Sequence, residues 1–163
     1  KQLEKLVRID SLTDSYNRRY GLELLARQMK LSQRNQSPLL IAFLDIDDFK
    51  AINDKYGHNE GDRVLKEVAD TFKTTLREVD IICRMGGDEF LLAFPDSSLQ
   101  EGPLIRERLQ NKLAQLNKYV DGDYTISLSM GFSEYLYDKP ANIDALISIA
   151  DQRMYKEKNN KKK

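Results

Sequence analysis

The segment Gly86-Gly87-Asp88-Glu89-Phe90 constrains the fold more than any other part of the chain. It lies between two short apolar stretches, 81–83 and 91–94, that have the length and composition of β-strands. Because two adjacent glycines allow a tight turn with positive φ, the segment predicts a β-hairpin with both carboxylates at its tip. Two neighbouring carboxylates in such a turn need a cation or a proton as partner.

The remaining apolar patterns predict helices alternating with two further strands. Helical spacing predicts helices at about 18–34, 48–55, 62–77 and 104–116 and from 143 to the basic tail, with Ser97 and Ser98 as N-caps before the fourth. The continuous apolar run at 39–44 indicates a strand buried on both faces, and the strict alternation at 124–132 indicates a half-buried strand. This pattern favours an α/β sandwich in which helices flank a central, mostly antiparallel sheet, with the active groups in its loops.

Composition limits the classes of partner and the cellular setting. The 26 basic and 26 acidic residues cancel, so no global field attracts a nucleic acid polymer or an anionic membrane, and any nucleotide site must be local. The single Cys83 in an apolar strand indicates a structural thiol in a reducing, cytoplasmic setting. No apolar run approaches the roughly 18 residues of a membrane span.

The chain is expected to hold one domain, residues 10–163, preceded by the end of an incoming signalling helix at 1–9. Leu3, Leu6 and Val7 have helical spacing, and the chain begins with Lys1 rather than Met. We therefore expect a piece of a longer protein. Its preceding part would carry a sensor or regulatory domain, and membrane anchoring through that part is left open.

Four carboxylates are expected to converge at one edge of the sheet. Asp45 and Asp47 would share a face at the end of the 39–44 strand, and if the 81–85 strand lies beside it, Asp88 and Glu89 come close. Such carboxylates repel one another unless a divalent cation is present, and hard oxygen ligands suit Mg²⁺ or Mn²⁺. The alternative is that Asp47 or Asp48 caps the 48–55 helix and that the hairpin tip is an ordinary polar turn.

Several separated motifs resemble those of the GGDEF domain, the catalytic domain of diguanylate cyclases. Beyond the hairpin, they are Asp10 to Arg19, Asp45 to Lys50 with Asn53, Gly57-His58 and Gly61-Asp62, Ser129 to Phe132, and Ala150-Asp151 with Tyr155. The resemblance covers about residues 10–162. It implies a fold similar to nucleotidyl-cyclase and polymerase palm domains and a role in bacterial second-messenger signalling. The implied reaction condenses two GTP into cyclic di-GMP with release of pyrophosphate, in a homodimer whose two domains each hold one GTP.

The resemblance also implies roles for residues around the acidic edge. Asp45, the Ile46 carbonyl and Asp88 would hold Mg²⁺, and Asp88 and Glu89 are the candidate catalytic carboxylates, with their division of labour left open. Lys50 would stabilise charge developing on the phosphates, its alternative being a solvated helix lysine. The backbone amides of Asp48, Phe49 and Lys50 open a helix and are placed to bind phosphate.

Guanine recognition is implied for Asn53 and Asp62, since a carboxylate accepts both N1–H and N2–H₂ of guanine but finds no such donor pair on adenine. Asp62 has the alternative role of capping the 62–77 helix. His58 matches a position near the nucleotide, or else braces the Gly57–Gly61 turn.

The basic tail is implied to contact phosphate through Lys158 and Lys162. The family often has arginine after glycine at the second position, whereas here Lys162 follows Lys161, so that bidentate phosphate contact is lost. The alternative is a frayed, solvated tail.

Arg77 and Asp80 stand at the spacing of the family's inhibitory RxxD site, where cyclic di-GMP binds away from catalysis. Arginine donates to guanine O6 and N7, and a carboxylate accepts from the opposite edge. The alternative is a helix-terminal salt bridge.

Two other functions stay open on the sequence alone. One is a catalytically silent module that binds GTP or cyclic di-GMP and signals to an attached domain. The other is a cyclase that acts within a single nucleotide.

Overall fold

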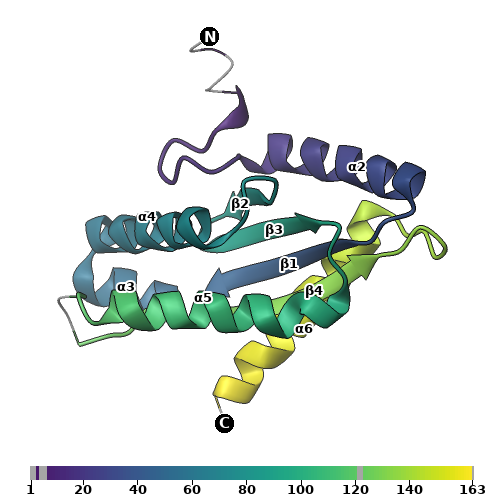
Figure 1. The fold of residues 1–163 in the computed structure, drawn as a ribbon. Helices are drawn as coiled ribbons and strands as arrows, with labels where there is room; N and C mark the ends of the chain where they lie inside the picture. The colour runs from purple at the N-terminus through teal and green to yellow at the C-terminus, as the bar shows by residue number, and fades with distance from the viewer. Residues whose placement is uncertain (1–2, 4–6, 121–122, 163) are drawn as a thin grey trace.

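The computed structural model describes residues 3, 7–120 and 123–162, and its centre is an antiparallel sheet covered by helices on both faces (Figure 1). Its four strands lie in the order β2-β3-β1-β4. They are β1 (Leu39–Ile46), β2 (Ile81–Gly86), β3 (Glu89–Pro95) and β4 (Leu128–Tyr135). Every pairing in the sheet is antiparallel, which confirms the predicted α/β sandwich.

The predicted helices are present, but one starts earlier than expected. They are α2 (Arg18–Asn35), α3 (Phe49–Tyr56), α4 (His58–Thr75), α5 (Gly102–Asn117), α6 (Ile143–Lys161) and the 3₁₀ helix η1 (Leu99–Glu101). Ser98 caps η1 in a capping box with Glu101. The chain turns from α3 into α4 at Gly57 alone, whose φ of 93° favours glycine. Residues 58–61, expected in a loop, are therefore helical.

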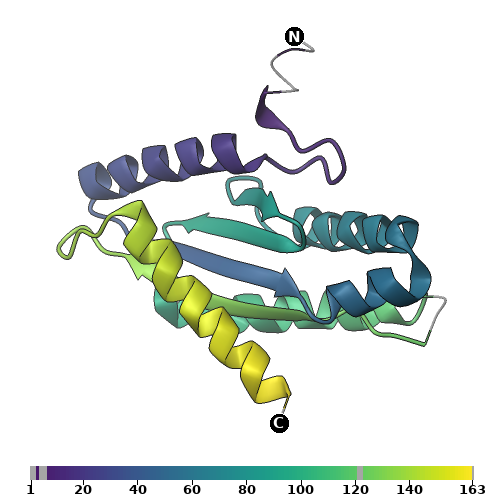
Figure 2. The ribbon, with the colours of Figure 1, turned by 180° about the vertical axis from the view of Figure 1, so that it is seen from behind.

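Side chains from the two faces of the sheet form two separate cores. Leu40, Ala42 and Leu44 of β1 pack with α4 and α5, whereas Leu39, Ile41 and Phe43 pack under α2 and α6. Figure 2 shows α6 running diagonally across that second face. All eight residues of β1 are buried, as the continuous apolar run predicted for its first six.

The prediction of a half-buried strand at 124–132 was wrong. β4 begins at Leu128, ends at Tyr135, and is buried on both faces because α6 covers the side that carries its serines. Gly131 lies where β4 and α6 approach each other closely, since a β-carbon there would lie 2.2 Å from the Ala150 carbonyl oxygen. The Ser133 hydroxyl donates to the Leu146 carbonyl at 2.7 Å, so these small polar residues serve packing against a helix.

The hairpin reaches β1 through its second strand and not, as expected, through residues 81–85. β3 lies between β2 and β1, and its register sets Glu89 opposite Asp45. The first strand of the hairpin is covered on its outer side by the segment that enters the domain, where Tyr16 N donates to the Ile82 carbonyl at 3.1 Å.

The expected helix at 1–9 lies largely outside the described residues, although Val7 and Arg8 are helical. Asn17 caps α2 by accepting from Tyr20 N and also donates to the Val7 carbonyl at 2.9 Å. This contact joins the incoming segment to the start of α2. Within the described ranges, no helix combines the length and apolar character that crossing a membrane requires.

Candidate active site

Asp45 is the centre of the acidic edge of the sheet. It is the penultimate residue of β1, only 6% exposed, and its register partners are Glu89 on β3 and Ser129 on β4. The next residue, Ile46, donates its backbone N–H to the Asp88 carbonyl at 3.3 Å. The end of β1 is thereby joined to the turn of the hairpin.

The two carboxylates of the hairpin occupy different positions, contrary to the expectation that both lie at its tip. β2 ends at Gly86 and β3 begins at Glu89, so the turn holds Gly87 and Asp88. Gly86 and Gly87 have φ values of 149° and 50°, which explains the glycine pair. Asp88 belongs to the turn, whereas Glu89 belongs to the strand and faces α2 and α6 as Asp45 does.

Burial dominates the electrostatics of these groups. It raises the pKa of Asp45, and the neighbouring carboxylates of Asp88 and Asp47 add to that shift against a hydrogen bond from Lys158. Burial also raises the pKa of Asp88, with a further contribution from Asp47. The pKa of Glu89 is raised by burial first and then by nearby carboxylates, among them Asp151 of α6. Added positive charge would therefore stabilise the ionised carboxylates at this edge.

Two lysines of α6 supply part of that charge. Lys158 Nζ lies 2.8 Å from Asp45 Oδ2, and Lys161 Nζ lies 2.9 Å from Asp47 Oδ2 and 2.6 Å from the Leu128 carbonyl oxygen. Since α6 is helical through Lys161, the alternative of a frayed tail is wrong for Lys158, whereas the second predicted phosphate contact, Lys162, lies just after the end of the helix. Lys162 is exposed and, with both other lysines, lines a cavity of about 150 Å³.

The alternative that an aspartate caps α3 is also wrong. Asp47 accepts hydrogen bonds from the hydroxyls of Ser127 and Ser129, each at 2.6 Å, in addition to Lys161. Burial alone would raise its pKa, but these three donors together lower it. Asp48 stands at the N-cap position with a φ of 55° and makes no capping bond through its side chain.

No metal-binding cluster of three or more His, Cys, Asp or Glu side chains is preformed in the described part of the chain. The donor set nevertheless fits a hard divalent cation. Asp45 Oδ1 is buried and has no hydrogen-bond partner, although the other oxygen of that carboxylate is bonded to Lys158. An orphaned, charged oxygen next to Asp88 and the Ile46 carbonyl is what Mg²⁺ or Mn²⁺ would satisfy.

The expected guanine-binding residues lie on two neighbouring helices. Asn53 on α3 has a buried Oδ1 without a hydrogen-bond partner, and Gly61 allows α4 to pass directly over it. Asp62 and His58 are exposed on α4. Because α4 begins at His58, Asp62 is too far into the helix to cap it, and no 57–61 turn exists for His58 to brace. Lys50 is exposed in the first turn of α3, a helix that begins at Phe49.

Arg77 and Asp80 form the ion pair that the alternative interpretation expected, in the turn after α4. Arg77 Nη2 lies 2.8 Å from Asp80 Oδ1 and also donates to the Pro95 carbonyl at 2.8 Å. The Asp80 side chain is 2% exposed and that of Arg77 is 52% exposed. A cavity of about 250 Å³ lies beside them, and Arg108 of α5 adds a second guanidinium to its lining.

The sequence patterns did not predict the role of Arg84. Its guanidinium donates to the Gly87 carbonyl at 2.9 and 3.1 Å and to the Asp10 carboxylate at 3.1 Å. Asp10 in turn accepts from Thr13 N at 3.0 Å. The turn of the hairpin is thus tied to the entry segment, and the only sequence signal for this link was the motif beginning at Asp10.

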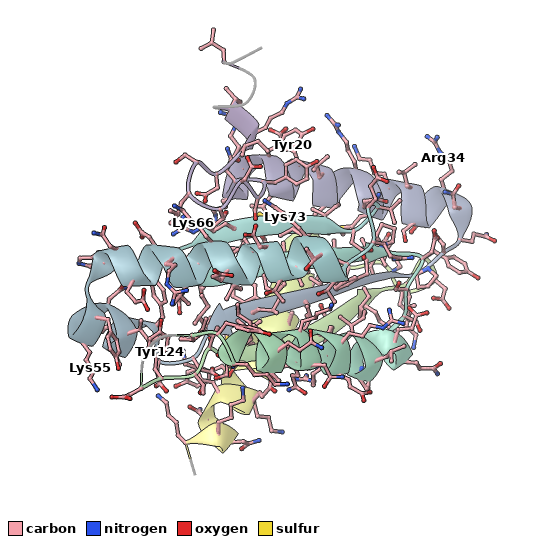
Figure 3. The ribbon with its side chains drawn as sticks, turned by 60° about the vertical axis from the view of Figure 1, so that its left-hand side comes forward. Tyr20, Arg34, Lys55, Lys66, Lys73 and Tyr124 are labelled. Atoms are coloured by element: carbon pink, nitrogen blue, oxygen red, sulfur yellow. The ribbon has the colours of Figure 1, made fainter. Side chains whose placement is uncertain are left out.

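A second unforeseen cluster joins the start of α4 to the segment before β4. Glu60 accepts from Arg63 and from the Tyr124 hydroxyl, and these bonds lower the pKa of Glu60 to about 2. Figure 3 shows Tyr124 beside α3, where its ring centroid is 5.0 Å from that of Tyr56. At the upper edge of α4 in Figure 3, Lys73 reaches from that helix to the Thr13 carbonyl at 2.9 Å.

The buried Cys83 packs against Gly21, and burial raises its thiol pKa to about 12, in keeping with the predicted structural role.

Comparison with known proteins gives consistent results. The diguanylate cyclase DosC of Escherichia coli K12 is 32% identical over 149 residues, which are 91% of this chain and 32% of DosC. The chain thus spans about a third of the length of this curated relative.

Among solved structures, the diguanylate cyclase SiaD of Pseudomonas aeruginosa, in complex with its activator SiaC, superposes with a TM-score of 0.87 at 34% identity. It covers 98% of this chain and 61% of SiaD. The GGDEF domain of DgcB from Caulobacter crescentus, in complex with c-di-GMP, has a TM-score of 0.82 at 25% identity over 94% of this chain and 91% of DgcB's. The family described as "Diguanylate cyclase, GGDEF domain" matches residues 7–163, and with this match over nearly the whole chain, the protein belongs to the GGDEF family.

Proposed function

We propose that this domain is a diguanylate cyclase that condenses two GTP molecules into cyclic di-GMP and releases two pyrophosphates. The observation that carries the proposal is the buried Asp45, whose unpartnered Oδ1 lies at a strand end joined to Asp88 and opposite Glu89. Family membership and named diguanylate cyclase relatives support the same activity.

In this proposal Asp45, the Ile46 carbonyl and Asp88 hold Mg²⁺ or Mn²⁺. The bound cation would neutralise the triphosphate and favour the attacking 3′-oxygen in its ionised form. Asp88 is the first candidate to accept the proton of the 3′-hydroxyl, because it sits in the turn and its raised pKa moves it towards the range of a general base. Glu89, whose pKa is also raised, is the second candidate.

The phosphates would lie between the start of α3 and the end of α6. Lys158 and Lys162 supply ammonium groups from α6, and Lys50 supplies one from α3. The α3 N-terminus at Phe49 adds backbone N–H groups and the positive end of a helix dipole. These groups would stabilise the negative charge that develops as the α-phosphate is attacked.

Guanine specificity would come from Asn53 and Asp62. The orphaned Oδ1 of Asn53 gains an N–H donor when guanine binds, and the Asp62 carboxylate accepts from N1–H and N2–H₂. Adenine presents no such donor pair. His58, the first residue of α4, would contact the nucleotide from the same pair of helices.

Catalysis would require a homodimer, because each bound GTP must present its 3′-hydroxyl to the α-phosphate of the other. A single domain with one site has only half of the reacting atoms. We propose that a sensor or regulatory part of the longer protein sets this dimer through the segment before Asp10. The hydrogen-bonded link from Asp10 through Arg84 to Gly87 supports communication from that segment to the catalytic turn.

Product inhibition would act through Arg77 and Asp80, which line a cavity with Arg108 away from the acidic edge. To bind guanine O6 and N7, the half-exposed guanidinium of Arg77 would exchange part of its bonding to Asp80 and the Pro95 carbonyl.

The test is incubation of the protein with GTP and Mg²⁺, at high concentration and also fused to a dimeriser, followed by mass analysis of the product. Cyclic di-GMP is the expected product. A monocyclic nucleotide would point to a cyclase that acts within one GTP. Nucleotide binding by calorimetry without turnover in the dimeric form would instead identify a silent signalling module, against which the intact Asp45, Lys50 and Asp88 argue.

A further inference from the structure

The last turns of α6 deliver two ammonium groups to the acidic edge of the sheet. Lys158 pairs with Asp45 and Lys161 with Asp47, at 2.8 and 2.9 Å. Residues three apart share one face of a helix, so both lysines point to the same edge. Their side chains are 28% and 39% exposed, so water screens the two pairs only in part.

Lys161 is held from two sides and is not a solvated tail residue. Its ammonium donates to Asp47 Oδ2 and to the Leu128 carbonyl. Asp47 is itself fixed by Ser127 and Ser129, whose hydroxyls bond to both of its carboxylate oxygens.

The charges at the edge do not balance evenly. Asp47 accepts hydrogen bonds from Ser127, Ser129 and Lys161, which together occupy both of its carboxylate oxygens. Asp45 is bonded to Lys158 through Oδ2 alone, and its buried Oδ1 has no hydrogen-bond partner. Lys161 therefore satisfies Asp47 and at the same time adds a fixed positive charge beside the two carboxylates that would bind a cation.

We propose that Lys161 is an internal counter-ion that weakens the binding of a free divalent cation at Asp45 and Asp88. The site would then hold its cation mainly together with nucleotide phosphates, whose negative charge outweighs that of the lysine. This inference deepens the proposed function and rests on it for the statement that the cation binds together with nucleotide phosphates. The effect on the free cation does not require turnover.

The experiment is a titration of the 163-residue chain with Mn²⁺ alone, without nucleotide and at low ionic strength, with free Mn²⁺ followed by electron paramagnetic resonance. Lys161→Gln removes the charge and keeps a hydrogen-bonding group. We expect its affinity for Mn²⁺ to rise by roughly three- to tenfold. In a water-like dielectric, the repulsion between a unit positive charge and a divalent ion several ångströms away has an energy that corresponds to this factor. Lys161→Arg keeps the charge and should keep the affinity of the unmodified protein.

Lys156→Gln is the matched control, because it removes the same charge from the same helix. Lys156 is exposed and lines the cavity between α5 and α6, away from Asp45 and Asp47. An equal rise in this variant would overturn the local assignment. Thermal melting followed by circular dichroism verifies that each variant is folded.

The direction of the change separates the inference from a purely structural role. If Lys161 only fastened the end of α6, its loss would loosen the edge and leave Mn²⁺ binding unchanged or weaker. Either result would overturn the inference, as would the absence of Mn²⁺ binding in all proteins. Failure of the proposed function would be seen separately, as the absence of cyclic di-GMP from GTP while the Mn²⁺ result stands.

Discussion

Gly61→Ala tests whether the packing of α3 against α4 sets the guanine-binding group. A β-carbon at Gly61 would lie 1.8 Å from Asn53 Oδ1 and 2.8 Å from its Cγ. Ordinary contact begins near 3.4 Å, so the amide must retreat by about 1.6 Å. Since the end of a side chain can rotate, the displaced group is Asn53 and not the backbone of either helix.

Two opposing effects act on the stability of the fold, and it remains nearly as stable as before because displacing the end of a side chain keeps the overpacking cost at the low end of its range. Alanine in a helix interior is favoured over glycine by about 0.5–1 kcal/mol, while overpacking costs about 1–3 kcal/mol. The function should respond more. If Asn53 binds guanine, loss of one net hydrogen bond of about 0.5–1.5 kcal/mol raises the KM for GTP by roughly two- to twelvefold. The kcat should change little, because this binding is equal in the ground and transition states.

The assay is the initial rate of cyclic di-GMP formation against GTP concentration, with a thermal melt of each variant. A double-mutant cycle with Asn53→Ala gives the decisive comparison, because that variant removes the group that clashes. Gly61→Ala should then lower kcat/KM no further. Gly102→Ala, which adds a methyl to α5 with the Phe132 ring 3.3 Å away, is the control and should leave KM unchanged. An unchanged KM for Gly61→Ala, or additive effects with Asn53→Ala, would refute the reasoning.

Three further substitutions test other parts of the site and fold. Asp88→Asn should abolish turnover yet raise the melting temperature of the metal-free protein at pH 7, because the raised pKa of Asp88 makes its ionised form destabilising. The gain in melting temperature should vanish below pH 3.8, the ordinary pKa of an aspartate, and a lower melting temperature at pH 7 would contradict the prediction. Gly131→Ala places a β-carbon 2.2 and 2.3 Å from backbone atoms of Ala150 and Met154, and should lower the unfolding free energy by about 1–3 kcal/mol or more; an unchanged denaturant midpoint would show that β4 and α6 separate freely. Arg77→Ala should leave turnover intact and weaken inhibition by cyclic di-GMP about tenfold, since a bidentate guanine contact contributes about 1–3 kcal/mol; unchanged inhibition removes the feedback assignment.

Local patterns in the sequence were sufficient to predict most of the helices and strands and to identify the candidate carboxylates. The apolar run of β1, the glycine pair of the hairpin and the helical spacing of α2 and α6 each depend on neighbours a few residues away. The carboxylates at Asp45 and Asp88 and the family motifs could be identified for the same reason. Such patterns encode which face of an element is buried, but not what buries it.

The tertiary structure decided which elements lie side by side. Only the sheet register shows that β3 and not β2 borders β1, and only the packing of α6 on β4 explains why serines of an alternating strand are buried. The same packing brings Lys161 to Asp47, residues 114 positions apart. Long-range pairings of this kind follow from how whole faces fit together, so the acidic motif could be predicted from the sequence whereas the lysines that balance its charge could be found only in the folded chain.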